Sequence, residues 1–139
     1  MKLEFEKIIP SDEQIDDLFT LLKSRKYTIS HSATPAKSKH IQFVSEHPYV
    51  VWYLIYKDKA LLGSVYIQLD NSIGIDLLEY NNENVLEVIN YIKDNHQPLP
   101  AIKSVRRSEF FVNVAPENAE FLLTLKNLDK GEIQRSFAI

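Results

Sequence analysis

The sequence contains no cysteine among its 139 residues. Disulfide bonds, thiolate chemistry and cysteine-based metal sites are therefore excluded. No apolar run approaches the ~20 residues that a membrane-spanning helix needs. The amino terminus, MKLEFEKIIP, alternates charged and apolar residues where a signal peptide would have a continuous apolar segment. We therefore expect a cytoplasmic protein with no membrane partner.

The chain also lacks an excess of basic residues. Its formal net charge is −3 and its pI is about 5.8, and this balance argues against a nucleic-acid partner. The apolar content of 45% is ordinary for a globular protein. At this length the chain can bury a core of its own, so we expect one domain over residues 1–139.

Several motifs that would define a chemistry are missing. The four histidines, His31, His40, His47 and His96, have no metal-ligand spacing and no paired carboxylate motif. No Ser-His-Asp arrangement, phosphate-binding P-loop or dinucleotide fingerprint occurs. The sequence therefore predicts no metal site and no common hydrolase or nucleotide-binding chemistry.

The clearest positive feature is a set of three apolar runs near the middle of the chain. Residues 50–56, 61–69 and 72–78 are rich in β-branched and aromatic residues, and short polar breaks at residues 57–60 and 70–71 separate them. An Asp-Asn break tolerates the positive φ of a tight hairpin. The pattern predicts a three-stranded antiparallel meander.

The remaining elements follow from periodicity and capping signals. Ser11 and Gln14 form a capping-box pattern ahead of an amphipathic segment, and the two side chains are expected to satisfy N–H groups of the first turn. The predicted helices cover residues 12–24, 35–47, 85–95 and 119–128, and the further strands cover 3–9, 109–114 and 132–139. Residues 25–34 are expected to form a loop.

The order of these elements is β-α-α-β-β-β-α-β-α-β. A meander followed by a strand–helix–strand crossover makes the fourth and fifth strands, residues 72–78 and 109–114, parallel neighbours. We therefore predict an α/β (α+β) fold with one central mixed, mostly antiparallel sheet.

This order, together with three segments, resembles the GNAT superfamily of acyl-CoA N-acyltransferases. The segments are residues 47–56 (HPYVVWYLIY), 62–67 with 73–75 (LGSVYI and IGI), and 111–118 (FVNVAPEN). The chain most resembles the bacterial subgroup that acetylates amino sugars and other small amines. The fold class is thus expected to be GNAT-like.

The resemblance implies a site between the fourth and fifth strands, with acetyl-CoA as the cofactor. In that family these strands splay apart, and freed backbone groups of the fourth strand pair with the pantetheine arm. A glycine-rich loop and the helix behind it bind the pyrophosphate. The residues that the resemblance assigns to cofactor binding are Gly74, Ile75, Leu77, Asn113 and Asn118, and those assigned to catalysis are Asp76, Glu79 and Tyr80.

The sequence departs from that family at the pyrophosphate loop. Only residues 79–84 separate the fourth strand from the next helix, and no glycine occurs between Gly74 and Gly131. The segment therefore lacks glycine, the residue that usually allows the backbone to approach a phosphate closely. Glu79 and Glu83 also place negative charge where the pyrophosphate would lie.

The second departure concerns the proton donor. The family usually has a Tyr seven residues after the Asn of its fourth helix and a Gly-Phe pair at the end of that helix. Here these positions hold Leu125 and Asp129-Lys130, whereas Asn118 is retained. We therefore expect the acyl-CoA chemistry to be degraded.

Simpler roles remain open for several residues. Asn118 is also a plain helix cap, and Asp76 is also an exposed strand residue. Lys103, Arg106 and Arg107 either receive an anionic ligand or belong to a solvated loop.

Two hypotheses follow. The first is a GNAT-like protein with lost or weakened acetyl-CoA binding, which serves as a small-ligand or protein-binding module and pairs with a second copy through its sheet edge or aromatic residues. The second is an active N-acetyltransferase that moves an acetyl group from acetyl-CoA to a small amine such as an amino sugar, with the phosphates held by Arg106 and Arg107 or by solvent. A short, closed turn over residues 79–84 favours the first, and the second requires the two strands to splay apart.

Overall fold

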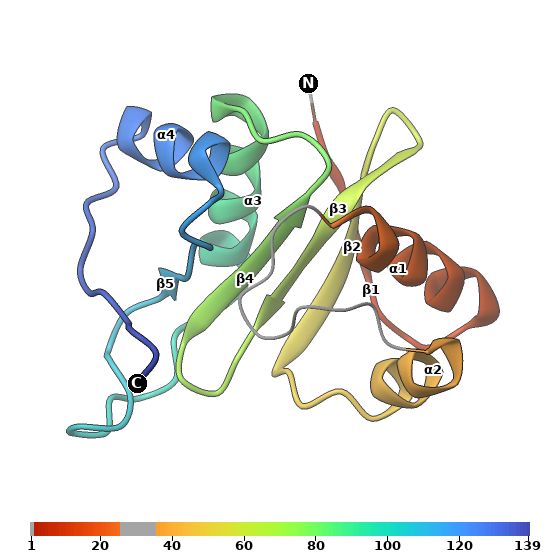
Figure 1. Ribbon diagram of the computed structural model, residues 1–139, viewed down its shortest axis with the longest axis horizontal. Helices are drawn as coiled ribbons and strands as arrows, with labels where there is room; N and C mark the ends of the chain where they lie inside the picture. Colours follow the sequence, from red (N-terminus) through yellow and green to blue (C-terminus); the bar gives the residue numbers. More distant parts are fainter. Residues whose placement is uncertain (1, 26–35) are drawn as a thin grey trace.

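The computed structural model describes residues 2–25 and 36–139. These residues form five strands and four helices, arranged as a mixed α/β fold (Figure 1). In chain order they are β1 (Glu4–Lys7), α1 (Asp12–Ser24), α2 (Lys37–Ser45), β2 (Val51–Lys57), β3 (Ala60–Ile67), β4 (Ser72–Leu77), α3 (Asn82–Asn95), β5 (Phe111–Val112) and α4 (Ala119–Asn127). The predicted α/β class is confirmed, and the predicted order of elements is matched from β1 to α4.

The strands form one mixed sheet in the order β1-β2-β3-β4-β5. β1 to β4 pair antiparallel, whereas β4 and β5 are parallel, as predicted. The β2–β3 turn has positive φ at Asp58 (51°) and Lys59 (66°), and the β3–β4 turn has positive φ at Asn71 (71°). Asp58 and Asn71 have short polar side chains that tolerate the left-handed region required by tight hairpins, and their two turns connect the strands of the meander.

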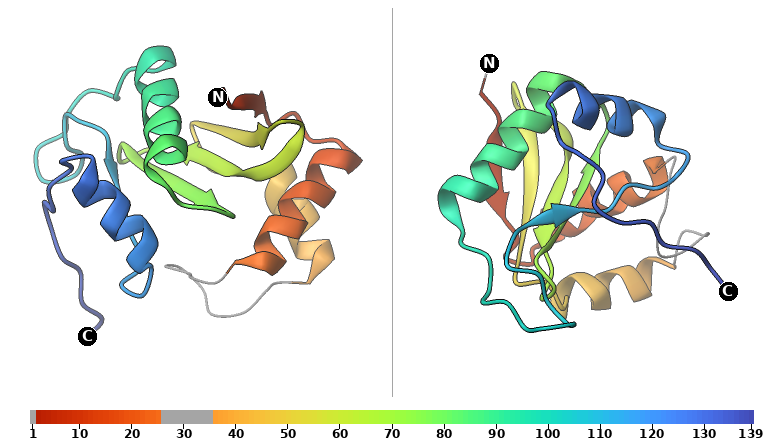
Figure 2. Two further views of the ribbon diagram at one scale, coloured as in Figure 1. Left: turned by 90° about the horizontal axis from the view of Figure 1, so that it is seen from above. Right: turned by 90° about the vertical axis from the view of Figure 1, so that its left-hand side faces the viewer.

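Helices cover both faces of the sheet (Figure 2). The alternation of side chains along β2 divides the core in two, because Tyr53 and Ile55 face one side and Trp52 and Leu54 face the other. The first side packs on Val85, Val88 and Ile92 of α3 and on Phe121 and Leu125 of α4. The second packs on Ile15, Leu18 and Leu21 of α1 and on Val44 of α2.

Local capping explains where the helices begin. α1 has the predicted bounds, and the Ser11 hydroxyl accepts from the Gln14 N–H at 3.3 Å. The Gln14 side chain differs from the capping-box expectation, since its Oε1 accepts from the Ile9 N–H at 2.9 Å. α3 begins at Asn82 rather than at residue 85, because the Asn81 side chain caps its first turn.

The prediction of a strand over residues 132–139 is wrong. Within the described part of the chain this segment pairs with no strand, and its alternating apolar side chains are exposed, Phe137 at 81%. Alternation determines which side chains share a face, but it does not provide an edge to pair with. The strand predicted over residues 109–114 is reduced to Phe111–Val112.

The second helix is shorter than predicted. α2 runs over Lys37–Ser45 instead of residues 35–47. Pro35, the predicted first helical residue, lies outside the described residues, as do residues 26–34 of the predicted loop and His31. None of the helices in the described ranges is long and apolar enough to cross a lipid bilayer.

Asn71 joins the β3–β4 turn to the long connection that leads into β5. Its side chain is fully buried, and its Nδ2 donates to the carbonyls of Leu99 at 2.9 Å and Arg107 at 2.8 Å. Its Oδ1 accepts from the Leu99 N–H at 2.8 Å. One amide side chain therefore holds the segment between α3 and β5 against the sheet and fixes where β5 meets β4.

Candidate functional site

β4 and β5 pair over only two positions and then separate. Ser72 is opposite Phe111 and Ile73 is opposite Val112, and no further pair forms. β5 accordingly lies beside only one end of β4 (Figure 1). From Gly74 onward, the β4 edge that faces away from β3 has no strand partner in the described structure.

A cavity of about 250 Å³ lies where the strands separate. Residues from five parts of the fold meet there: the residue that ends α1, β3 and its turn, β4, the β4–α3 junction, and the segment that leads from β5 into α4. The residues that matter for its chemistry are Arg25, Tyr66, Asp76, Tyr80, Asn113 and Asn118. The cavity is thus formed by polar groups that are distant in the sequence.

The Tyr80 side chain occupies the open edge of β4. Its hydroxyl accepts from the Leu77 N–H at 3.2 Å and donates to the Ile75 carbonyl at 3.3 Å. Its ring stacks on Phe121 of α4, with ring centroids 4.9 Å apart. Burial is the largest cause that raises the pKa of Tyr80, so the hydroxyl stays protonated. The chain therefore satisfies part of this strand edge with its own side chain.

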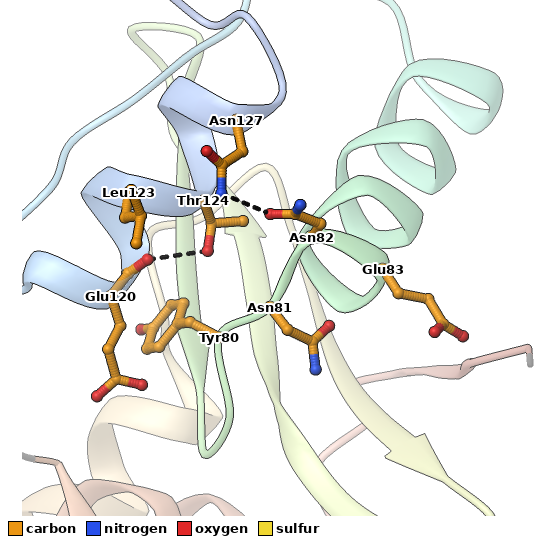
Figure 3. A pocket seen from close by; sticks show the side chains of 8 residues that line it. All are labelled: Tyr80, Asn81, Asn82, Glu83, Glu120, Leu123, Thr124 and Asn127. Atoms are coloured by element: carbon orange, nitrogen blue, oxygen red, sulfur yellow. Dashed lines mark hydrogen bonds between the residues drawn. The ribbon is translucent and has the colours of Figure 1, made fainter.

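Tyr80 also lines a second, wider cavity of about 520 Å³ between the start of α3 and α4 (Figure 3). The other lining side chains are amides, carboxylates and small groups, and no cationic residue is among them: Asn81, Asn82, Glu83, Glu120, Leu123, Thr124 and Asn127. Tyr80 therefore lines both the wide cavity and the narrow one.

The junction between β4 and α3 is a short turn closed by its own side chains. The Asn81 Oδ1 accepts from the Asn84 N–H at 2.8 Å, and the Asn84 side chain donates to the Glu79 carbonyl at 3.2 Å. Glu79 in turn accepts from the Asn81 side chain at 2.8 Å. The Asn81 cap thus engages the Asn84 N–H, one of the first-turn groups that bind phosphate at other helix starts.

Asp76 is the carboxylate of the narrow cavity. It lies on β4 opposite Ser64 of β3, and 24% of its side-chain surface is exposed. Its Oδ2 is 3.6 Å from the Nε of Arg25, the residue that caps the end of α1. Burial raises the pKa of Asp76, and the nearby Arg25 guanidinium opposes that rise.

Gly74 has a steric role in this wall. A Cβ at this position would lie 2.0 Å from the ring of Tyr66, its cross-strand neighbour on β3. The Tyr66 ring is itself held by stacking on Tyr49, with centroids 3.9 Å apart. The absence of a side chain at Gly74 therefore allows an aromatic ring to lie across the strand.

Six of the eight residues predicted for the site line the narrow cavity: Gly74, Ile75, Asp76, Tyr80, Asn113 and Asn118. The Leu77 side chain lies in the core that packs on α3 instead, and only its N–H is directed toward Tyr80. Glu79 is exposed and lines neither cavity described here. The Asn118 Oδ1 accepts from the Phe121 N–H at 3.1 Å, which is the helix-cap role that the sequence left open.

Sequence reasoning missed Arg25 and Phe121. Arg25 ends α1 and meets Asp76 across the fold, so no local signal marks it. The basic residues that the sequence did single out lie elsewhere. Arg106 donates to the carbonyls of Pro100 and Leu69, and Arg107 pairs with Glu109. Neither arginine lines either of the cavities described here.

Comparison with known proteins gives fold-level matches only. No protein-family model and no curated protein sequence matches the chain. Among solved structures, aminoglycoside N-acetyltransferase AAC(6')-Iy in complex with CoA matches at a TM-score of 0.59 and 11% identity, covering 99% of this chain and 93% of that one. The same enzyme with the bisubstrate analog CoA-S-monomethyl-acetylneamine matches at a TM-score of 0.57 and 10% identity, over 100% of this chain and 97% of that one.

A third structure, a possible acetyltransferase from Clostridium difficile 630, matches at a TM-score of 0.52 and 14% identity, and covers 100% of this chain and 97% of that one. All three matches extend over essentially the whole chain, and all three are to acetyltransferases or a possible acetyltransferase. The chain therefore shares the fold of these proteins.

Proposed function

We propose that this chain is a small-ligand-binding protein with an acetyltransferase-like fold in which binding of acetyl-CoA is weakened or lost. The observation that carries this proposal is the Tyr80 hydroxyl on the open edge of β4, bonded to Leu77 N–H and Ile75 carbonyl. A ligand that pairs with this edge must first displace two hydrogen bonds. At about 1 kcal/mol each, this costs roughly 2 kcal/mol, or about a 30-fold loss of affinity.

Two further features support weakened cofactor binding. The β4–α3 turn is closed by Asn81 and Asn84 and contains no glycine. The wide cavity beside it carries Glu83 and Glu120 with no cationic residue in its lining. Both features disfavour a polyanion such as the pyrophosphate of CoA.

The position that carries the proton donor in the resemblance is also altered. Leu125 lies buried in the core beneath α4 and has no ionisable group. A leaving thiolate would therefore need its proton from another residue. Binding of a small ligand in the narrow cavity requires neither a pyrophosphate-binding loop nor a proton donor.

The test is calorimetric titration of the full chain with acetyl-CoA, with desulfo-CoA as the thiol-free control. We expect no measurable heat and no thermal shift at millimolar ligand. Micromolar binding of either molecule would overturn the proposal, because it would mean that other groups replace the missing loop. The Asn118→Ala variant, titrated in parallel, then reports whether the start of α4 contributes.

The second candidate function is an active N-acetyltransferase acting on a small amine such as an amino sugar. The observation that favours it is the separation of β4 from β5 after two paired positions, which leaves room at the strand edge. The AAC(6')-Iy structures are complexes with CoA and with a bisubstrate analog. Release of free CoA from acetyl-CoA that depends on an added amine would establish this function, and its absence across an amine panel would exclude that panel.

A further inference from the structure

The narrow cavity contains one acidic and one basic side chain that face each other from different elements. Asp76 comes from near the end of β4 and Arg25 from the end of α1. The closest atoms of the pair, Asp76 Oδ2 and Arg25 Nε, are 3.6 Å apart. Charge-assisted hydrogen bonds between such groups are typically about 2.7–2.9 Å long. The pair is therefore loose, with a single long contact.

The Asp76 carboxylate has little else to stabilise it. Among the interactions of the described residues, the contact with Arg25 is its only hydrogen bond or ion pair. Its side chain is 24% exposed, so most of the carboxylate is withdrawn from water. Burying a charge with one weak partner is costly. A group that supplied hydrogen bonds to Asp76 would recover part of that cost.

The arrangement of charges discriminates among ligands. An amine cation that binds Asp76 competes with Arg25 and leaves that guanidinium without its partner. A carboxylate that binds Arg25 leaves Asp76 unpaired in the same way. A ligand with both groups pairs each charge of the cavity with one of its own, so that neither Asp76 nor Arg25 is left unpaired.

The size and lining of the cavity limit the ligand further. A volume of about 250 Å³ is below the range typical of drug-sized ligands, so the cavity suits a smaller molecule. The Tyr80 hydroxyl and the Asn118 Oδ1 already have hydrogen-bond partners within the fold. Asp76 and Arg25 are the two charged groups among the described lining residues, and the long contact between them leaves most of their hydrogen-bonding capacity unused.

We propose that the cavity between β4, β5 and the end of α1 binds a small zwitterion of the amino-acid type, with its ammonium group on Asp76 and its carboxylate on Arg25. This inference rests on the proposed small-ligand-binding function and names its ligand class. A zwitterion that lies across the pair would exchange one loose 3.6 Å contact for two charge-assisted pairs, one on each side chain.

The experiment is titration of the full chain, without acetyl-CoA, with the free proteinogenic L-amino acids. Binding is followed by calorimetry and by the rise in unfolding temperature. Each amino acid that binds is compared with its methyl ester, which lacks the carboxylate, and with its N-acetyl derivative, which lacks the cation. We expect at least one free amino acid to bind, and both derivatives to bind about tenfold more weakly or worse.

Two variants place the ligand. Asp76→Asn and Arg25→Gln are each expected to weaken the binding of the free amino acid by about tenfold or more. Arg107→Gln is the matched control, because Arg107 pairs with exposed Glu109 and does not line the cavity. The affinity of Arg107→Gln for the free amino acid should equal that of the unmodified chain. Circular dichroism confirms that each variant is folded, and Arg25→Gln decides the matter if Asp76→Asn does not fold.

Three results would overturn the inference. They are no binding of any free amino acid at millimolar concentration, equal binding of the ester or the N-acetyl derivative, and unchanged affinity in both folded variants. Tight binding of acetyl-CoA would instead overturn the proposed function. Since the amino-acid titrations contain no acetyl-CoA, the two failures are distinguishable.

Discussion

The Tyr80 hydroxyl lies 3.2 Å from the Leu77 backbone nitrogen and accepts its hydrogen bond. Only two residues separate them in the sequence, so the β4–α3 turn folds the tyrosine back onto the strand that precedes it. The same hydroxyl donates to the Ile75 carbonyl at 3.3 Å. One side chain thus takes the place that a neighbouring strand or an extended ligand would otherwise occupy beside β4.

Two substitutions of Tyr80 distinguish the contribution of its hydroxyl to stability from that of its ring. Tyr80→Phe removes both hydrogen bonds but keeps the stacking on Phe121, and should lower the free energy of unfolding by about 1–2 kcal/mol. Tyr80→Ala also removes the ring and should cost about 3 kcal/mol. Urea denaturation of the two variants measures the difference.

The same variants test whether Tyr80 hinders the binding of acetyl-CoA. Tyr80→Ala removes both the hydroxyl bonds on the β4 edge and the ring that lines the two cavities, so acetyl-CoA should bind it about 30-fold or more tightly than it binds the unmodified chain. Tyr80→Phe keeps the ring but removes both hydroxyl bonds, so it should recover up to the roughly 30-fold attributed to them, and any further gain in Tyr80→Ala measures the effect of the ring. An alanine variant that binds acetyl-CoA no better than the unmodified chain would contradict the blocking role.

The Gly74 prediction concerns packing rather than catalysis. Gly74→Ala places a Cβ 2.0 Å from the Tyr66 ring, which cannot shift freely because it stacks on Tyr49 at 3.9 Å. We expect the free energy of unfolding to fall by about 1–3 kcal/mol, the usual cost of overpacking. Gly131→Ala is the control, since nothing lies within 4 Å of its added Cβ. A change below about 0.5 kcal/mol at Gly74 would show that the ring relaxes easily.

How far the sequence predicts this fold depends on whether the determinant is local. The bounds of α1 follow from the Ser11 cap and a helical apolar pattern, and both act within one segment. The meander follows from turn residues such as Asn71, whose positive φ its short side chain tolerates. In these places one stretch of sequence contains all the information that its structure needs.

The features that the sequence did not predict depend on contacts between distant segments. Residues 132–139 alternate like a strand, but no edge in the described structure receives them. The Asp76–Arg25 pair joins β4 to the end of α1, and neither segment signals the other. Gly74 was assigned to a cofactor through family resemblance, whereas its structural reason is the Tyr66 ring on the next strand.

Asn71 provides a test of how β5 is positioned. Asn71→Ala removes three hydrogen bonds to the connection at Leu99 and Arg107 and leaves a residue with a Cβ at a φ of 71°. We expect a loss of about 3 kcal/mol or more in the free energy of unfolding. Asn71→Gly loses the same bonds without the backbone strain and should be about 1 kcal/mol less damaging. Equal losses in the two variants would mean that the positive φ costs little here.

Stability should fall as the pH decreases below about 7, because burial lowers the pKa of His40 and so favours its neutral form in the folded state. His40 is 5% exposed and its Nε2–H donates to the Ile15 carbonyl at 3.1 Å. Below the unfolded-state pKa of 6.5 the unfolded chain binds a proton that the folded chain binds less readily. This group therefore removes at most about 1.4 kcal/mol of stability per pH unit as the pH falls through that window.

Burial also lowers the pKa of His47 and His96, so these two groups change stability in the same direction. Urea denaturation over about pH 5 to 8, the range in which histidine titrates, should show the decline, and His40→Gln should make it less steep. A His40→Gln variant with the same pH dependence as the unmodified chain would show that His40 is protonated equally well in the folded and unfolded states.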